Sequence, residues 1–238
     1  MKVEWIPASQ AVVDMVPPPV PASTALPDWY KATKPFDGDG RPVIGSGGVS
    51  TNITVKMCVP FRDAMAAGYI QKTWCDLNVE SADAVRVTDL SRPRRAPFVP
   101  ELAGVRREPG VPIPPEYYQS ELVWIQPWQP KLPAGWSMLL LPALNRMDSP
   151  ITGGSGIIDS DVFHHTINGK IPFYIRRGFQ GIIPAGTGMY QMIPIKREDW
   201  TSEAIGYDNR ETLRKYAFMH RHFIAGYRRH FAKRKRYL

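Results

Sequence analysis

The sequence is poor in cysteine, has no long apolar run, and has no acidic residue in its last 27 positions. Its two cysteines, Cys58 and Cys75, exclude a disulfide framework and favour free thiols in a reducing compartment over a single bridge. No run approaches the roughly 18 apolar residues that a membrane-spanning helix needs. The first residues lack the charged and apolar regions of a signal peptide. We therefore expect a protein made in a cytoplasm, with no membrane partner.

Because residues 212–238 contain no Asp or Glu, positive charge is concentrated at that end of the chain. Residues 212–238 carry nine Lys and Arg side chains, whereas the whole chain has a net charge of +8. The first 211 residues are therefore nearly neutral. This segregation predicts a polyanionic or acidic partner for one end of the molecule. The expected contacts, to DNA or to an acidic protein face, are Arg228, Arg229, Lys233, Arg234, Lys235 and Arg236.

Proline is the main excess. The chain has 24 prolines, about twice the usual share of roughly 5%. Because proline can neither donate to a sheet nor continue a helix, the regular elements must be short. Residues 1–48 are predicted to form an extended arm that docks on its own domain or on a neighbouring subunit. The apolar residues expected to dock are Val12, Val13, Met15, Val16, Trp29 and Tyr30.

Residues 49–205 predict a mainly β core. Apolar and polar residues alternate in Ser50–Val59, and a hairpin is expected between Tyr69–Val79 and Ala84–Leu90. A short helix is expected at Phe61–Ala67, ended by Gly68. Later strands are expected at Glu121–Gln126, Ser137–Leu141, Gly156–Phe163, Ile171–Ile175, Gly181–Pro184 and Met189–Ile195, with a hairpin turn at Asn168-Gly169. These spacings suit a sandwich or a barrel.

Two segments of the chain are basic: one lies within this core and one follows it. The connection 91–118 is interpreted as a solvated crossover rather than a functional basic loop, and it holds Arg92, Arg94, Arg95, Arg106 and Arg107. Residues 206–238 predict one basic amphipathic helix, with Asp208 as N-cap and Glu211 completing a capping box. Apolar residues from Leu213 to Phe231 recur every three or four positions. We expect this stripe to dock on the β core, in preference to lying on a membrane.

The segment 135–197 resembles a known family. The pattern comprises Gly135-Trp136, Pro142-Ala143-Leu144-Asn145, Gly156-Ile157-Ile158-Asp159-Ser160-Asp161 and, after Gly186, Gln191-Met192-Ile193-Pro194-Ile195-Lys196-Arg197. With Ala67-Gly68-Tyr69-Ile70 upstream, it is similar to an uncharacterised β-rich family of bacteria and tailed phages, over residues 55–200. That family has no established activity, so the resemblance implies a β-rich phage protein without naming a reaction.

Gly156–Asp161 also resembles the signature of trimeric dUTPases and related deoxynucleotide deaminases. That resemblance implies a β-clip-like fold in which Asp159 orients the hydrolytic water and contacts the sugar. Val162 stands where the family has a tyrosine that stacks on deoxyribose, and Leu144-Asn145-Arg146 replaces its Arg-Ser-Gly phosphate motif. The chain also ends in a basic helix rather than a glycine-rich arm. Nucleotide hydrolysis is therefore the alternative, and we expect Asp159 to be structural.

A metal cluster of Asp159, Asp161, His164 and His165 is a further interpretation of this segment. In a strand, the two aspartates share a face from which His164 is excluded. We therefore expect turn-capping aspartates, no metal, no cofactor and no catalytic residue.

Together these features predict a mainly β protein with a sandwich or β-clip-like core, a proline-rich arm and a basic helix. The predicted function is that of a tailed-phage virion structural protein: a decoration, head-completion or minor structural subunit. It would be made in the host cytoplasm, reside in the virion and dock on other virion proteins in an oligomeric assembly. We predict that it is not an enzyme.

Overall fold

The structure, a computed structural model, describes the chain except residues 39–42, 46–47, 51–52, 82–84, 90–99, 101, 106–111, 121, 166–168, 222–225 and 236–238. The described strands are β1 (Glu4–Pro7), β2 (Val20–Pro21), β3 (Val43–Gly45), β4 (Gly48–Ser50), β5 (Tyr69–Lys72), β6 (Leu77–Ser81), β7 (Val85–Asp89), β8 (Ala103–Val105), β9 (Leu122–Ile125), β10 (Trp128–Lys131), β11 (Trp136–Pro142), β12 (Ile151–Gly153), β13 (Gly156–Ile158), β14 (Lys170–Ile175), β15 (Gly181–Ile183) and β16 (Gly188–Lys196).

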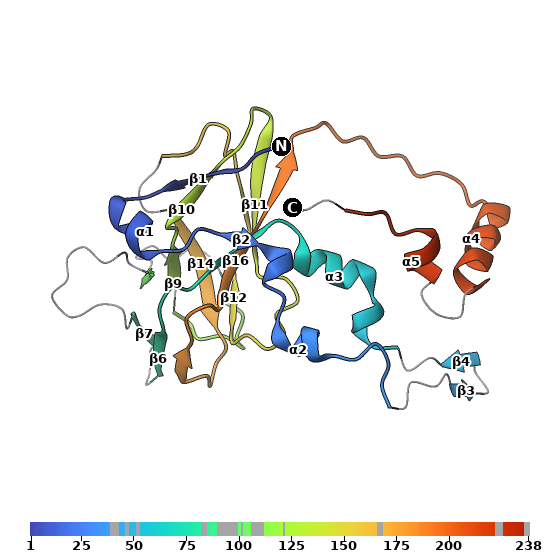
Figure 1. The fold of residues 1–238 in the computed structure, drawn as a ribbon, viewed down its shortest axis with the longest axis horizontal. Coiled ribbons are helices and arrows are strands. Elements are labelled where there is room, and N and C mark those ends of the chain that lie inside the picture. The colour runs from blue at the N-terminus through green and yellow to red at the C-terminus, as the bar shows by residue number, and fades with distance from the viewer. Residues whose placement is uncertain are drawn as a thin grey trace.

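The described α-helices are α1 (Gln10–Met15), α2 (Asp28–Ala32), α3 (Val59–Ala66), α4 (Asn209–Arg221) and α5 (Gly226–His230), with 3-10 turns at Ala22–Thr24 and Val55–Met57. Strands hold 32% and helices 22%, which confirms the predicted mainly β class. Figure 1 shows most strands gathered in one body, from which the β3–β4 pair and the helices α4 and α5 stand apart.

The strand pairs that the structure describes are antiparallel. A five-stranded sheet has the order β13-β11-β16-β5-β2, and a four-stranded sheet has the order β12-β14-β9-β8. A three-stranded sheet, β15-β6-β7, and the pairs β1-β10 and β3-β4 complete the set. The hairpin predicted around residues 81–83 is confirmed, because Ser81 of β6 lies opposite Val85 of β7.

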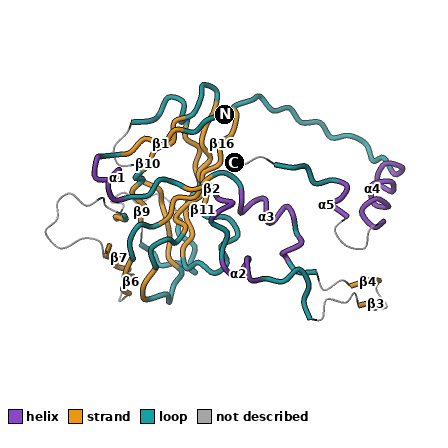
Figure 2. The backbone as a smooth tube through the Cα atoms, in the orientation of Figure 1, coloured by secondary structure: helices purple, strands orange, loops and turns teal. Residues whose placement is uncertain are grey.

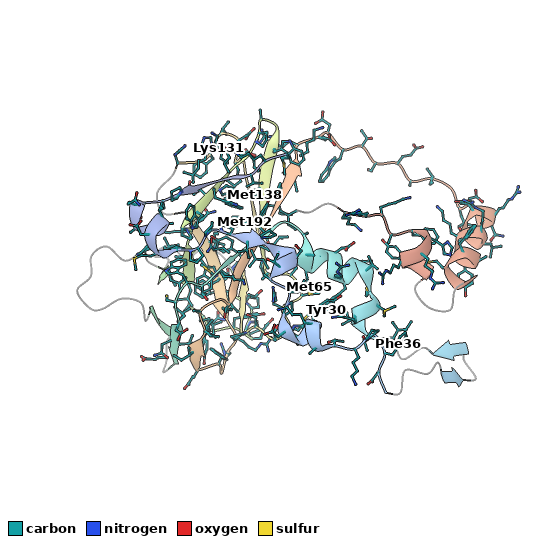
Figure 3. The ribbon with its side chains drawn as sticks, viewed as in Figure 1. Tyr30, Phe36, Met65, Lys131, Met138 and Met192 are labelled. Carbon is teal, nitrogen blue, oxygen red and sulfur yellow. The ribbon has the colours of Figure 1, made fainter. Side chains whose placement is uncertain are left out.

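One hydrophobic core joins the five-, four- and three-stranded sheets. Met138 and Met192 of the five-stranded sheet, and Trp124 and Phe173 of the four-stranded sheet, are all fully buried in it. The rings of Trp124 and Phe173 stack with their centroids 3.7 Å apart. Burying side chains of this size stabilises the fold by about 1.5–3 kcal/mol each. The two larger sheets thus pack face to face as a sandwich, with Met138 and Met192 inside the β body in Figure 3.

The segment predicted as an N-terminal arm is built into this body. Strand β1 pairs with β10, and β2 pairs with β5 at an edge of the five-stranded sheet. Proline fits both places, because an edge strand need not donate on its outer side. Between the two strands, the carbonyl oxygen of Val16 accepts a hydrogen bond of 3.0 Å from Nε1 of Trp128. Residues 1–21 therefore belong to the folded core.

Helix α3 is fixed to the sheet by one glycine and one glutamine. Gly68 follows the helix with φ +65°, and a Cβ there would lie 2.0 Å from the carbonyl oxygen of Met192. Only glycine tolerates both conditions. The buried side-chain amide of Gln191 donates to the carbonyl oxygens of Ala64 (2.9 Å) and Ala67 (2.6 Å). The helix predicted over 61–67 and its end at Gly68 are thus confirmed.

Three predicted strands differ from the structure. Over 50–59, Thr54 caps a 3-10 turn by accepting from the backbone N–H of Lys56, so the segment curls instead of extending. The run 69–79 splits into β5 and β6, which lie in different sheets. Strand β13 ends at Ile158, because the Asp159 carbonyl then accepts from two later backbone N–H groups in a turn. Arg92, Arg94, Arg95, Arg106, Arg107 and Asn168 lie outside the described residues.

The C-terminal arm, residues 198–238, leaves the body after β16. Its first part, the linker (residues 198–208), has no helix or strand. Figure 2 shows it as a long loop that runs from the sheet to α4, after which the chain turns back through α5. The predicted domain boundary at residue 205 falls inside this linker, not at the edge of the β core.

Candidate functional site

The C-terminal arm is anchored where β16 ends. The backbone N–H of Arg197 donates to the carbonyl oxygen of Gly135 at 2.9 Å. Its guanidinium donates to Asp161 (Nη1–Oδ1 2.9 Å) and to Asp159 Oδ1 (3.1 Å). Asp161 also accepts from the backbone N–H of Gly135. This cluster fixes the direction in which the chain leaves the body.

The linker beyond this anchor is exposed. Trp200, Ile205 and Tyr207 are 88%, 85% and 78% exposed, which for large apolar side chains is unusual in a monomer. Residues 199–206 make no hydrogen bond or ion pair with any part of the chain that the structure describes. An extended segment that holds three such side chains away from the body has the composition of a docking arm, not of a solvated spacer.

Helix α4 starts as predicted. Asp208 Oδ1 accepts from the backbone N–H of Glu211 at 2.9 Å, which confirms the N-cap. The Glu211 side chain binds Arg214 and Lys215, so it does not complete the capping box. These two cations lower the pKa of Glu211 to about 2.

The apolar stripe of α4 does not dock on the β core, so that expectation is wrong. Leu213 and Tyr216 remain 59% and 62% exposed. Helix α4 packs instead against α5, where a Cβ on Gly226 would lie 2.0 Å from the carbonyl oxygen of Met219. Helices α4 and α5 therefore pack on each other, and Figure 1 shows them apart from the sheets.

The predicted basic residues lie on α5 and in the segment after it. Arg228, Arg229, Lys233 and Arg234 are exposed. Lys235 forms an ion pair with Asp63 of α3, so this residue finds an acidic partner within its own chain. Arg236 lies outside the described residues. The linker is acidic by contrast, since Asp199 and Glu203 lie in a stretch without Lys or Arg.

The residues predicted to dock a neighbouring subunit differ in their burial. Val12, Val16 and Tyr30 are buried within this chain, so they dock on their own domain and are not available to a neighbour. Val13 and Met15 are 50% and 47% exposed. Trp29 is half-buried, and its Nε1 donates to Asp148 at 3.0 Å. Figure 3 shows Tyr30 beside α3, on which Met65 is also buried.

The segment that resembles dUTPases is used as a structural link in this fold. Oδ1 of Asp159 accepts from the Ser137 hydroxyl at 2.8 Å and from Arg197, and its side chain is 61% exposed. Asp161 is only 7% exposed in its side chain, and the Arg197 guanidinium, helped by the Gly135 N–H, lowers the pKa of Asp161 to about 2. Among the residues described, no group of three His, Cys, Asp or Glu side chains could hold a metal ion.

A groove lies on the other end of the body. It has a volume of about 610 Å³ and is formed by four segments: residues 24–31 around the start of α2, β5 with Ile70 and Lys72, residues 146–150, and residues 179–188. Leu26, Ile70, Phe179 and Ile182 give it an apolar floor, and Lys31, Lys72 and Arg146 give it positive charge. Burial lowers the pKa of Arg146, whose guanidinium donates to the carbonyl oxygen of Ala25.

Sequence reasoning missed both the linker and the groove. The linker could have been found, because helical and strand periodicity are both lost between Lys196 and Asp208 while Trp200 and Ile205 interrupt an acidic stretch. The groove had no comparable signal, because its four segments are spread over more than 100 residues of the sequence.

Comparison with known proteins gives no relative: no family model, no curated protein and no solved structure matches the chain. The resemblances to the phage family and to dUTPases therefore stay predictions. Of the helices described, none is long and apolar enough to span a membrane.

Proposed function

We propose that this chain is a structural subunit of a tailed-phage particle, which docks on neighbouring subunits through its C-terminal arm. The observation that carries the proposal is the arm itself. It holds Trp200, Ile205 and Tyr207 away from the body, each more than three-quarters exposed. Large exposed aromatic and aliphatic groups of this kind anchor protein–protein interfaces.

The distribution of charge supports the same proposal. The body, residues 1–197, has a net charge of +3 (20 basic minus 17 acidic residues), whereas the much shorter arm has +5 (10 minus 5), with an acidic linker followed by basic helices. Arg228, Arg229, Lys233 and Arg234 face solvent, where they can reach DNA or an acidic surface of a neighbour. The pairing of Lys235 with Asp63 supports acidic protein as one such surface. The phage assignment itself rests on the resemblance over residues 55–200.

The test is to purify the particles of the phage that encodes this chain and to quantify the chain in them by mass spectrometry. A structural subunit stays at a constant ratio to the major shell protein through successive density gradients. An abundant cytoplasmic protein of the host serves as the carry-over control and should fall at each step. A chain that falls in parallel with this control is not part of the particle, and the proposal is then wrong.

A further inference from the structure

The groove and the linker are chemically complementary. The groove has an apolar floor and three cationic side chains, Lys31, Lys72 and Arg146. Its two carboxylates are already engaged: Asp28 accepts from Lys31 at 2.9 Å, and Asp148 accepts from the Trp29 indole. The pairing of Asp28 also neutralises Lys31, so the groove has a net charge of +1, and Lys72 is the cation on it that forms no ion pair within the described ranges.

The linker presents the opposite charge and the matching apolar groups. Between Glu198 and Arg210 it has acidic residues but no Lys or Arg. Asp199 and Glu203 form no ion pair with the described part of the chain, whereas Glu198 pairs with Lys196. Trp200, Ile205 and Tyr207 alternate with these carboxylates and are all exposed. A segment of this composition suits an apolar groove with a cationic rim.

Trp200 cannot reach the groove of its own chain. Gly188 lines the groove at one end of β16, and the linker begins beyond Lys196 at the other end. At about 3.3 Å per residue, this strand separates the two by roughly 26 Å. Trp200 is four residues beyond Lys196 and can reach at most about 14 Å. In Figure 1 the linker leaves the upper end of the body, whereas α2 lies at the lower end.

We propose that residues 199–207 of one copy lie in the groove of a second copy. Trp200 and Ile205 would pack on the apolar floor, and Asp199 and Glu203 would meet Lys72 and Arg146. Because the linker and the groove are different surfaces, the contact is heterologous, and repetition gives a closed ring or a helical chain of subunits. This inference rests on the proposed assembly function. It identifies a second copy of this chain as a partner of the arm.

The experiment measures self-association of the full chain by sedimentation velocity over a concentration series. The linker variant combines Trp200→Ala, Ile205→Ala and Tyr207→Ala. We expect it to weaken the Kd of self-association by about tenfold or more, since each side chain acts as an anchor. Circular dichroism should be unchanged, because these side chains are exposed. The matched control, Ile157→Ala with Val162→Ala and Phe163→Ala, removes three apolar side chains of the body that are each more than half exposed, and it should leave the Kd unchanged.

A charge exchange tests the groove directly. Lys72→Glu and Glu203→Lys should each weaken association by roughly fivefold or more, and the two together in one chain should restore it. An entirely monomeric wild-type chain overturns the inference, as does self-association that neither the linker variant nor Lys72→Glu changes. If the linker variant loses self-association while Lys72→Glu keeps it, the linker does not bind in the groove and the inference is also wrong. If the chain is monomeric in solution yet remains in purified particles, the inference fails while the proposed function stands.

Discussion

The Nη1 atom of Arg197 lies 2.9 Å from Oδ1 of Asp161, at the point where the C-terminal arm leaves the body. Arg197 is the last residue whose backbone bonds to the sheet region, through the Gly135 carbonyl. The pair therefore holds the base of an arm in which residues 199–206 make no hydrogen bond or ion pair with the described part of the chain. This cluster holds the arm at its base, and the ion pair of Lys235 with Asp63 ties its far end to α3.

The first prediction concerns the pH dependence of this pair. The pKa of Asp161 is about 2 in the folded chain, below its ordinary value of 3.8, because Arg197 and the Gly135 N–H favour the charged form. Asp161 therefore stabilises the fold above about pH 4, and this stabilisation is lost as the pH falls toward 2. Asp161→Asn should be less stable than the wild type at about pH 6, and the difference should shrink as the pH falls through this window.

Urea unfolding of both chains across this pH range provides the measurement. Glu198→Gln is the control, because it removes an exposed ion pair with Lys196 and should change the free energy of unfolding by less than about 0.5 kcal/mol. A difference between wild type and Asp161→Asn that stays constant down to about pH 2 contradicts the proposed role of the pair.

The second prediction concerns the glycine that ends α3. Gly68→Ala should lower the free energy of unfolding by more than about 2 kcal/mol, because the residue has φ +65° and its Cβ would meet the Met192 carbonyl oxygen. Gly178→Ala is the matched control, with φ +87° and open space around its Cβ. It should cost only the roughly 1–2 kcal/mol of the backbone conformation. Equal losses for the two variants would show that the close contact with Met192 is unimportant.

Strands and turns that depend on local sequence could be predicted, whereas contacts between distant segments could not. The apolar runs Ser137–Leu141 and Met189–Ile195 predicted two strands, and their bounds agree with those of β11 and β16 to within one residue. Short apolar runs of this kind are typical of buried strands. The stop at Gly68 was also predicted. Its close contact with Met192 was not, since that contact joins segments more than 120 residues apart.

The structure places the predicted site residues differently from the expectation. The N-cap at Asp208 was predicted correctly, because capping depends on neighbouring residues. The predicted docking of Leu213 and Tyr216 on the β core was wrong, because an amphipathic pattern does not indicate which surface its apolar face contacts. Val12, Val16 and Tyr30 were assigned to docking because they are large and apolar. They are buried in their own body, where β1 and β2 pair with strands that no local pattern identifies.

The third prediction concerns Asp159 and the dUTPase alternative. Its Oδ1 accepts from Ser137 and Arg197, so we expect Asp159→Asn to lower stability without changing any turnover of dUTP or dCTP. Wild type and variant should both release no pyrophosphate above a no-protein blank. Release by the wild type that disappears in Asp159→Asn would favour the enzyme.

The fourth prediction concerns the exposed basic residues. If the four side chains of Arg228, Arg229, Lys233 and Arg234 each contact a phosphate, the slope of log K against log salt for duplex DNA should be about −3 to −4. Replacing all four with Gln should remove most of this slope and affect all DNA sequences equally. The matched control replaces four basic residues that are exposed on the body, namely Lys34, Lys170, Arg176 and Arg177.

In that control variant the slope should stay near the wild-type value. Equal losses in the two variants would mean that the arm has no special role in binding DNA. A wild-type chain that binds no DNA at low salt would leave acidic protein, of the kind that Lys235 meets at Asp63, as the partner of these residues.

The most direct test of the whole account asks whether the arm brings the chain into the particle. The chain with Trp200→Ala, Ile205→Ala and Tyr207→Ala would replace the wild type in the phage genome, and its copy number per particle would be measured by mass spectrometry. The control is the chain with Ile157→Ala, Val162→Ala and Phe163→Ala. Our account predicts that the linker variant stays in the unassembled fraction of the lysate while the control enters particles at the wild-type ratio. A linker variant that enters particles at the same ratio as the control would contradict it.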